Sequence, residues 1–182
     1  IKQPPWECLA SYICATYANI PGIRRKIALL SETFGSPIYR DAEPVLYSFP
    51  SAETLSDSAL CDISRCSLGY RAPYLCQTAR DIAADPGWVD RICALGYDSA
   101  RRDLMRLMGV GPKVADCVLL FGFQKYEAFP VDVWIARIMQ HCYGVPEKEG
   151  YEKISRRGRE IFGPYAGYAQ EYLYADRERL LS

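Results

Sequence analysis

Several features that mark other classes of protein are missing from this sequence. It has no apolar run near the roughly 20 residues that a membrane-spanning helix needs, so we expect no span. Basic and acidic residues number 22 each, which argues against a nonspecific polycation but allows a local basic face. The first residues do not follow the basic-then-apolar pattern of an export signal.

Metal and cluster sites are also poorly supported. The eight cysteines form no CxxC pair, their spacing does not fit a four-cysteine iron–sulfur cluster, and His141 is the single histidine. Several cysteines fall on apolar faces of predicted helices, so we expect reduced, buried thiols rather than disulfides. No metal and no cofactor are expected.

Helical periodicity is present along most of the chain, and no period-2 alternation predicts a sheet. We expect helices at about 5–18, 21–34, 71–85, 87–95, 99–108, 112–123, 133–143, 149–162 and 165–181. Ser51, Ser56 and Asp98 are expected to cap helices, and 36–50 to form a loop with an extended piece. The sequence therefore predicts an all-α fold.

The most informative segment is the turn Gly109-Val110-Gly111 between two predicted helices, a helix–hairpin–helix. Its two glycines permit positive φ and let a DNA backbone come close. The helix that begins after the turn offers free N–H groups and the positive end of its dipole, which can hold a phosphate. Taken alone, the turn is equally compatible with a simple connection between two helices.

Two ionisable residues near this turn are the candidate catalytic pair. Lys113 lies in the first turn of the second helix, where a cation opposes the dipole and is unfavourable if it is only structural. The dipole, together with burial in a cleft, would favour the neutral amine that a nucleophile requires. Asp132 follows Pro130-Val131 at a predicted helix start, so we expect it to be an N-cap, and at this point it is equally compatible with a cap alone or with a carboxylate partner of Lys113.

The segment from Gly109 to Cys117, followed by Pro130-Val131-Asp132, resembles the helix–hairpin–helix DNA glycosylase superfamily. Within it, the chain is most similar to the 8-oxoguanine DNA glycosylases, because three further segments match in the same order: Glu7–Cys14, Leu68–Ala72 and Gly163–Gln170. The resemblance runs nearly from end to end, although it covers the helical core and not the family's N-terminal β-rich domain.

This resemblance implies a bifunctional glycosylase and AP lyase that excises oxidised purine from duplex DNA. Lys113 would attack the sugar C1′ and form a Schiff base, and β-elimination would then nick the strand. Asp132 would stabilise the oxocarbenium charge. Cys117 and Tyr174 would cover the two faces of the flipped base, and Gln170 would read its Watson–Crick edge.

On the opposite strand, the resemblance implies that Tyr70 enters the duplex and Arg71 contacts the orphaned cytosine, with Tyr17 and Asn19 completing this group. Tyr17 replaces an asparagine of the eukaryotic pattern and Gly22 replaces an arginine, so a strict preference for cytosine is not expected. Met108 replaces the hairpin proline. Trp134 replaces a histidine near the phosphate of the flipped nucleotide, and tryptophan cannot supply that charge.

By resemblance, residues 21–124 form one helical lobe ending in the hairpin, residues 1–20 with 125–182 form a second, and DNA binds in the cleft between them. We expect a monomer that acts on damaged double-stranded DNA inside the cell, with the chromosome. Two alternatives stay open. A monofunctional glycosylase for alkylated or mismatched bases would not need Lys113, and a non-catalytic DNA-binding module would not need the Lys113–Asp132 pair.

Overall fold

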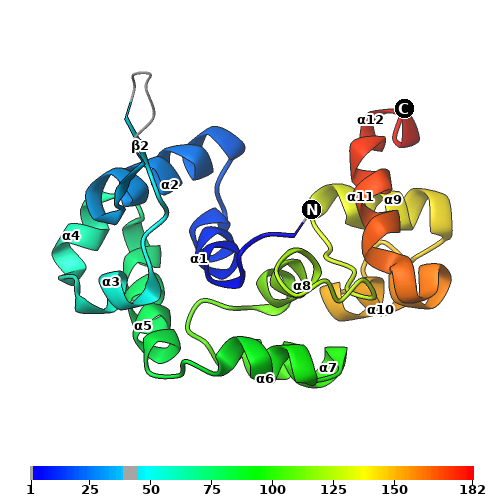
Figure 1. Ribbon diagram of the computed structural model, residues 1–182. Helices are drawn as coiled ribbons and strands as arrows, with labels where there is room; N and C mark the ends of the chain where they lie inside the picture. The colour runs from blue at the N-terminus through cyan, green and yellow to red at the C-terminus, as the bar shows by residue number, and fades with distance from the viewer. Residues whose placement is uncertain (1, 39–44) are drawn as a thin grey trace.

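The computed structural model describes residues 2–38 and 45–182, and these are largely helical (Figure 1). The α-helices are α1 (Pro5–Ala15), α2 (Ile20–Phe34), α3 (Ala52–Asp57), α4 (Leu60–Arg65), α5 (Ala72–Ala83), α6 (Trp88–Ala94), α7 (Tyr97–Leu104), α8 (Pro112–Phe121), α9 (Val133–Tyr143), α10 (Tyr151–Phe162), α11 (Ala166–Ala175) and α12 (Arg177–Leu180). Short 3₁₀ turns, η1 (Gly69–Arg71) and η2 (Gly163–Tyr165), precede α5 and α11. The all-α prediction is confirmed.

One small sheet lies within the stretch expected to be a loop. Strands β1 (Pro37–Ile38) and β2 (Leu46–Tyr47) pair antiparallel, with Pro37 opposite Tyr47 and Ile38 opposite Leu46. Residues 39–44 of that expected loop lie outside the described residues. Strands of two residues are too short to give an alternating pattern in the sequence.

The helix caps agree with the sequence at Ser51, whose Oγ accepts a hydrogen bond from Thr54 N (3.2 Å) at the start of α3. The caps expected at Ser56 and Asp98 are wrong. Ser56 lies inside α3 and donates to Glu53 O (2.8 Å). Helix α7 begins after Gly96, and Asp98 lies in its first turn. Tertiary packing outweighs the cap preference there, because Tyr97 is buried and bonded to a carboxylate of α8.

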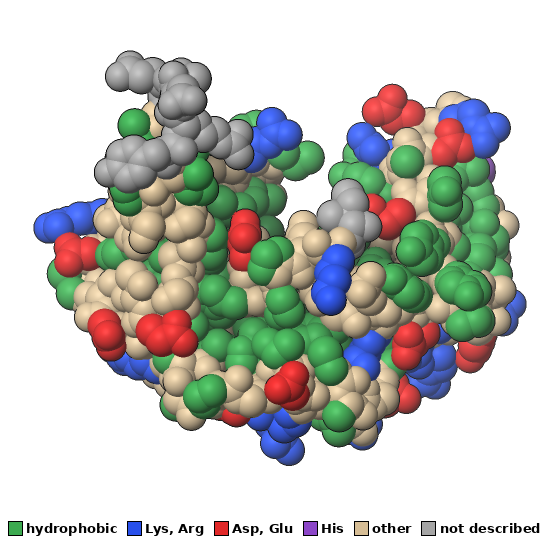
Figure 2. All heavy atoms as spheres, in the orientation of Figure 1, with side chains coloured by type: hydrophobic (Ala, Val, Ile, Leu, Met, Phe, Trp, Pro, Cys, Tyr) green, Lys and Arg blue, Asp and Glu red, His purple; other side chains and the backbone are tan. Residues whose placement is uncertain are grey.

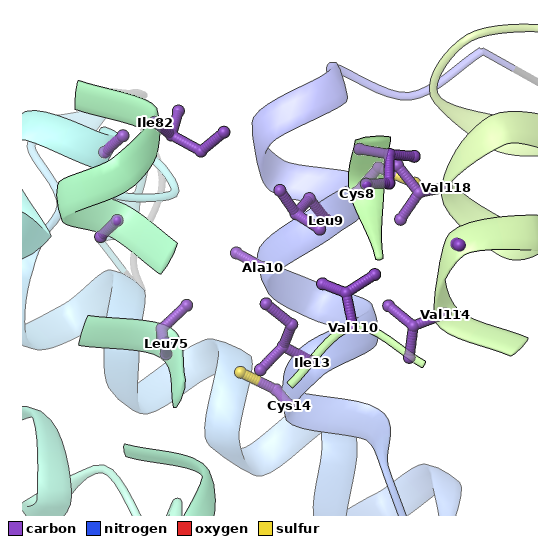
Figure 3. Close-up of a cluster of buried hydrophobic side chains, with 14 of the residues drawn as sticks. Cys8, Leu9, Ala10, Ile13, Cys14, Leu75, Ile82, Val110, Val114 and Val118 are labelled. Atoms are coloured by element: carbon purple, nitrogen blue, oxygen red, sulfur yellow. The ribbon is translucent and has the colours of Figure 1, made fainter. Parts of the chain in front are cut away.

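The buried apolar side chains form two clusters. The first comes from α1–α8 and the residues up to Ala128, and the second comes from Phe129, α9, α10 and α11. Helix α1 belongs to the first cluster, and the lobes expected from the sequence, which group residues 1–20 with the C-terminal helices, stay a prediction. Leu9, Ile13 and Cys14 are fully or almost fully buried in the first cluster, where α1 contacts α2, α5 and α8 (Figure 3).

A cleft opens between the two sides of the molecule. Figure 2 shows the hollow in the space-filling view, and Figure 1 places α1 and α8 between the α2–α5 side and the α9–α12 side. This arrangement puts the start of α8, with its preceding hairpin turn, in a central position between the two sides.

All eight cysteines are free thiols, and the expectation of buried thiols is confirmed for five of them, whereas Cys61, Cys93 and Cys142 are exposed. Burial raises the pKa of the Cys8 and Cys14 thiols to about 12. In the described part of the chain, no group of three or more His, Cys, Asp or Glu side chains is placed to hold a metal ion. None of the described helices has both the length and the apolar character needed to cross a membrane.

Candidate functional site

The hairpin turn depends on one glycine for its backbone conformation. Gly109 has φ +82°, and a Cβ at this position would lie 2.8 Å from Tyr74 Cβ, so both the torsion and the neighbour require glycine. Gly111 has an ordinary φ of −89°, so the second glycine does not use the positive φ that its residue type permits. A Cβ on Gly111 would meet no atom within 4 Å, so that side of the turn is open.

The turn is anchored to the rest of the fold from two directions. Val110 is buried and lies beside Ile13 and Val114 in the first core cluster (Figure 3). From α5, Thr78 Oγ1 donates to Met108 O (2.9 Å). Because its side chain is used in packing, Val110 presents only its backbone to a ligand.

Lys113 is the second residue of α8, directly after Pro112, as expected. Its side chain is exposed, so the expectation of burial is wrong. The physical reason is its place one residue inside the helix start, on the face turned away from the buried Val114 and Ala115. An exposed amine at the start of α8 is accessible to a ligand as large as a nucleic acid.

Asp132 is the N-cap of α9, which confirms the cap prediction. Its Oδ1 accepts a hydrogen bond from Ile135 N (2.8 Å). Within the described part of the chain, no hydrogen bond engages Oδ2. The carboxylate is therefore fixed by one oxygen and has the other free for a substrate.

A buried network that the sequence analysis missed connects the helix of Lys113 to the loop of Asp132. Asp116 is fully buried, and its carboxylate accepts hydrogen bonds from Tyr97 Oη (2.6 Å), Arg101 Nε (2.8 Å) and Tyr151 Oη (2.6 Å). The Tyr151 hydroxyl in turn accepts a hydrogen bond from Val131 N (3.4 Å). A charged residue inside the apolar run of α8 was the signal that could have revealed this site.

The partners of Asp116 offset only part of the cost of burying its carboxylate. Burial raises the pKa of Asp116, while the hydrogen bonds from the two tyrosines and the charge of Arg101 act in the opposite direction. Arg101 also pairs with Glu152 Oε1 (2.9 Å) at the surface. Since Asp116 lies one turn after Lys113 and Tyr151 holds the residue before Asp132, the network fixes both candidate catalytic residues relative to each other.

Cys117 lies on the same face of α8 as Lys113, one turn further along. Burial raises the pKa of this thiol, and the positive charge of Lys113 opposes that shift, so the two side chains are near each other. Tyr12 of α1 lies close to Cys117, and the pKa of Tyr12 is raised mainly by burial and also by the charges of Cys117, Cys8 and Glu171. Tyr12 thus lies next to both Cys117 and α11, and no signal in the sequence singled it out.

Helix α11 approaches both catalytic elements. Gly167 packs so closely on α8 that a Cβ would lie 2.3 Å from a methyl of Leu120. At Glu171, burial followed by the negative charge of Asp132 raises the pKa of the carboxyl group. The described structure therefore brings α8, the start of α9 and α11 together, as a pocket built from Cys117, Gln170 and Tyr174 requires.

Gln170 of α11 is the one residue among those described with a fully buried side-chain polar atom lacking a hydrogen-bond partner. Its side chain is 6% exposed, and the unpartnered atom is Oε1. An unpaired buried amide oxygen is costly, and in native proteins such groups call for a ligand, a water or a functional role. Tyr174 is half-buried, one helical turn after Gln170, with the Arg177 guanidinium 4.6 Å from its ring centroid.

The four residues expected at the opposite base lie at two adjoining turns. Asn19 caps α2 through a hydrogen bond from Gly22 N (2.9 Å), and Tyr17 precedes it on the surface. Tyr70 is half exposed in η1, and Arg71 is buried with its guanidinium 4.4 Å from the Tyr70 ring centroid. Arg71 donates to carbonyl groups of the Tyr17 turn, so the structure brings the two turns together.

These features define a helix–hairpin–helix protein with a lysine at the hairpin exit and a capping aspartate on the neighbouring helix. Residues 21–164 match the model of the HhH-GPD superfamily of base excision DNA repair proteins, and the chain belongs to this family.

The chain is similar to proteins that carry more specific names. The probable N-glycosylase/DNA lyase of Methanothermobacter thermautotrophicus is 35% identical over 98% of this chain and 62% of its own length. The N-glycosylase/DNA lyase of Saccharomyces cerevisiae is 33% identical over 96% of this chain and 55% of its own length. The chain therefore spans 55–62% of the length of these relatives.

Among solved structures, the chain is similar to the 8-oxoguanine glycosylase/lyase of Clostridium acetobutylicum, in a complex with double-stranded DNA containing cytosine opposite 8-oxoguanine. The TM-score is 0.92 at 37% identity, over 98% of this chain and 61% of that one.

Proposed function

We propose that the chain is the catalytic core of a bifunctional DNA glycosylase and AP lyase that excises 8-oxoguanine from double-stranded DNA. The observation that carries the proposal is the arrangement at the start of α8. Lys113 is exposed there in a central position, and the Asp116–Tyr151–Val131 network ties its helix to the N-capping Asp132. The names of the relatives support this substrate and this pair of activities.

In this reaction Lys113 Nζ attacks C1′ of the damaged nucleotide while the glycosidic bond breaks and the base leaves with the bonding electrons. The free oxygen of Asp132 stabilises the positive charge that develops on the sugar. Loss of a proton from nitrogen and ring opening give an imine between Lys113 and C1′. Removal of a C2′ proton then expels the 3′ phosphate and nicks the strand. A water-activating glycosylase would stop after base release, so the lysine accounts for the lyase step.

The flipped base is proposed to lie between Cys117 and Tyr174, with its edge on Gln170. The unpartnered Oε1 of Gln170 supports this assignment, because a purine edge supplies the N–H donor that the protein lacks there. The Arg177 guanidinium lies on one face of Tyr174, and Arg137 and Arg177 both lie over the Trp134 ring (5.4 and 5.9 Å to its centroid). We assign to these two arginines the positive charge near the flipped nucleotide's phosphate that Trp134 itself cannot provide.

DNA is proposed to occupy the cleft of Figure 2, with the hairpin turn at Gly109–Gly111 on its backbone and the turns of Tyr17 and Tyr70 on the opposite strand. The two core clusters support two lobes on either side of the cleft, with α1 belonging to the first. The chain is proposed to act as a monomer on chromosomal DNA inside the cell.

The test is excision from otherwise identical duplexes that carry 8-oxoguanine, guanine, hypoxanthine or 3-methyladenine. We expect strand nicking at 8-oxoguanine without added alkali. Base release that needs alkali to reveal a nick would instead make the protein a monofunctional glycosylase. Binding to all four duplexes with no base release would leave only a DNA-binding module.

A further inference from the structure

A cavity of about 320 Å³ adjoins the candidate base pocket in the seam between α8 and α11. On α8 it is lined by Leu120, which lies three residues after Cys117. On α11 it is lined by Gly167 and by Glu171, the residue that follows Gln170. Residues three and four apart share one face of a helix, so the cavity continues the proposed base pocket by about one helical turn.

Glu171 is the one charged side chain among the described residues that line this cavity, and the others are apolar or aromatic. The residue is open to solvent, so a ligand in the pocket can reach it. Among residues 2–38 and 45–182, no hydrogen bond or ion pair engages its carboxyl group. The carboxylate is therefore free to act on a substrate.

The carboxyl group of Glu171 lies near the proposed positions of both the sugar and the base. Helix α11 contacts α9 (Figure 1), and the pKa of Glu171 is raised by burial and then by the negative charge of Asp132 at the start of α9. The pKa of Tyr12 is raised by burial and then by charges that include those of Cys117 and Glu171. Glu171 is thus close to the residue proposed to face C1′ and to the neighbourhood of the residue proposed to face the base.

The lyase step needs a proton acceptor at C2′, and the other ionisable groups of the site are poorly suited to that task. Lys113 is used as the nucleophile, and Asp132 is fixed by its helix cap. Burial raises the pKa of Cys117 and of Tyr12, so both stay protonated at neutral pH and cannot accept a proton. A general base works best when its pKa is near the operating pH, so the raised pKa of Glu171 makes it a better acceptor than an ordinary glutamate.

We propose that Glu171 is the general base of the lyase step and takes the proton from C2′ of the protonated imine formed with Lys113. The inference rests on the proposed function. The electrons of the C2′–H bond form a C1′–C2′ double bond, and the imine nitrogen takes up the electrons of the C–N π bond. The resulting enamine returns them, which forms a C2′–C3′ double bond and expels the 3′ phosphate with the electrons of the C3′–O bond. The proton stays on Glu171, and no oxidant or reductant is needed.

Glu171→Gln is the direct test, because glutamine keeps the size of the side chain and loses the basic carboxylate. On a duplex with a preformed abasic site, we expect nicking to slow at least about a hundredfold, the lower end of what a general base contributes. Borohydride trapping on that duplex should equal or exceed the wild-type yield, because the imine forms before the blocked step. Single-turnover release of 8-oxoguanine should stay within about threefold of wild type, because breaking the glycosidic bond does not use Glu171.

Glu171→Ala adds a test by chemical rescue. Removal of the side chain leaves room for acetate, whose carboxylate can take the C2′ proton instead, so nicking by this variant should rise with acetate concentration. Glu171→Gln fills that space and should gain nothing from acetate. Glu160→Gln on α10 is the matched control, because Glu160 is exposed and pairs with Arg157 at the surface, and it should nick as wild type does.

The outcomes separate this inference from the proposed function. Nicking by Glu171→Gln at the wild-type rate would overturn the role of Glu171 and leave the proposed glycosylase and lyase intact. Equal losses of base release, trapping and nicking, or a loss of nicking that acetate does not restore in Glu171→Ala, would make Glu171 a structural residue and also overturn the assignment. Base release by the wild-type protein without trapping or nicking would instead overturn the lyase activity itself, and with it the step assigned to Glu171.

Discussion

Gln170→Met separates the recognition of the base from the chemistry on the sugar. The substitution keeps the length and flexibility of the side chain but removes the amide. In the free protein, Oε1 of Gln170 is buried without a partner, and such a group costs about 1–3 kcal/mol. Methionine has no acceptor to leave unpaired, so we expect the variant to be more stable by about 1 kcal/mol, which is about 2–4 °C in Tm for a chain of this size.

The same change should impair excision of the base. A site that hydrogen-bonds its substrate loses about 1–3 kcal/mol when one partner is removed, so single-turnover release of 8-oxoguanine should fall at least about tenfold. Nicking at a preformed abasic site should stay within about twofold of wild type, because that reaction needs the lysine and has no base to recognise.

Thermal unfolding and two gel assays, one on 8-oxoguanine and one on an abasic site, give all three values. Gln77→Met on α5 is the matched control, because Gln77 is exposed and bonded only to Asp81 of its own helix. It should leave all three values unchanged. If Gln170→Met lowered the Tm, or reduced the abasic-site reaction as much as base release, Gln170 would be a structural residue and the pocket assignment would be wrong.

Three further substitutions test the other parts of the site. Asp132→Asn keeps a side-chain oxygen for the cap on Ile135 N but loses the charge, so base release should slow at least about a hundredfold, and a rate within a few-fold of wild type would make Asp132 a cap only. Tyr174→Ala should reduce lesion processing by about 1–3 kcal/mol without changing affinity for undamaged duplex, which phosphate contacts dominate; equal losses in both assays would contradict a role in the pocket. Asp116→Asn leaves Arg101 with Glu152 as its one charged partner among the described residues and should lower stability by about 3 kcal/mol in denaturant unfolding, whereas a change below about 1 kcal/mol would show that the network does not hold α8 in place.

The parts of the fold that were predictable are those whose signals are local. The hairpin turn, the start of α9 at Asp132 and the end of α2 before Gly35 follow from glycine, proline and capping residues in short segments. Both candidate catalytic residues lie in such segments. Their positions along the chain therefore followed from the sequence before any long-range contact was known.

The burial of individual groups was not predictable, because it depends on which helices pack against each other. The exposed side chain of Lys113, the buried carboxylate of Asp116 and the place of α1 in the first cluster all follow from the packing of α8. The commitment of Arg71 to backbone carbonyls 54 and 55 residues away is likewise a long-range contact that no local pattern encodes.

The central claim is that Lys113 is the nucleophile, and trapping of its imine tests this most directly. Sodium borohydride added during reaction with an 8-oxoguanine duplex should link the protein covalently to the DNA. Lys113→Gln should abolish the cross-link while binding to the duplex is retained. The control is Lys153→Gln on α10, which removes a lysine that pairs with Glu149, and it should trap as well as wild type. Equal trapping by Lys113→Gln and the wild-type protein would show that another amine forms the imine and would contradict the account.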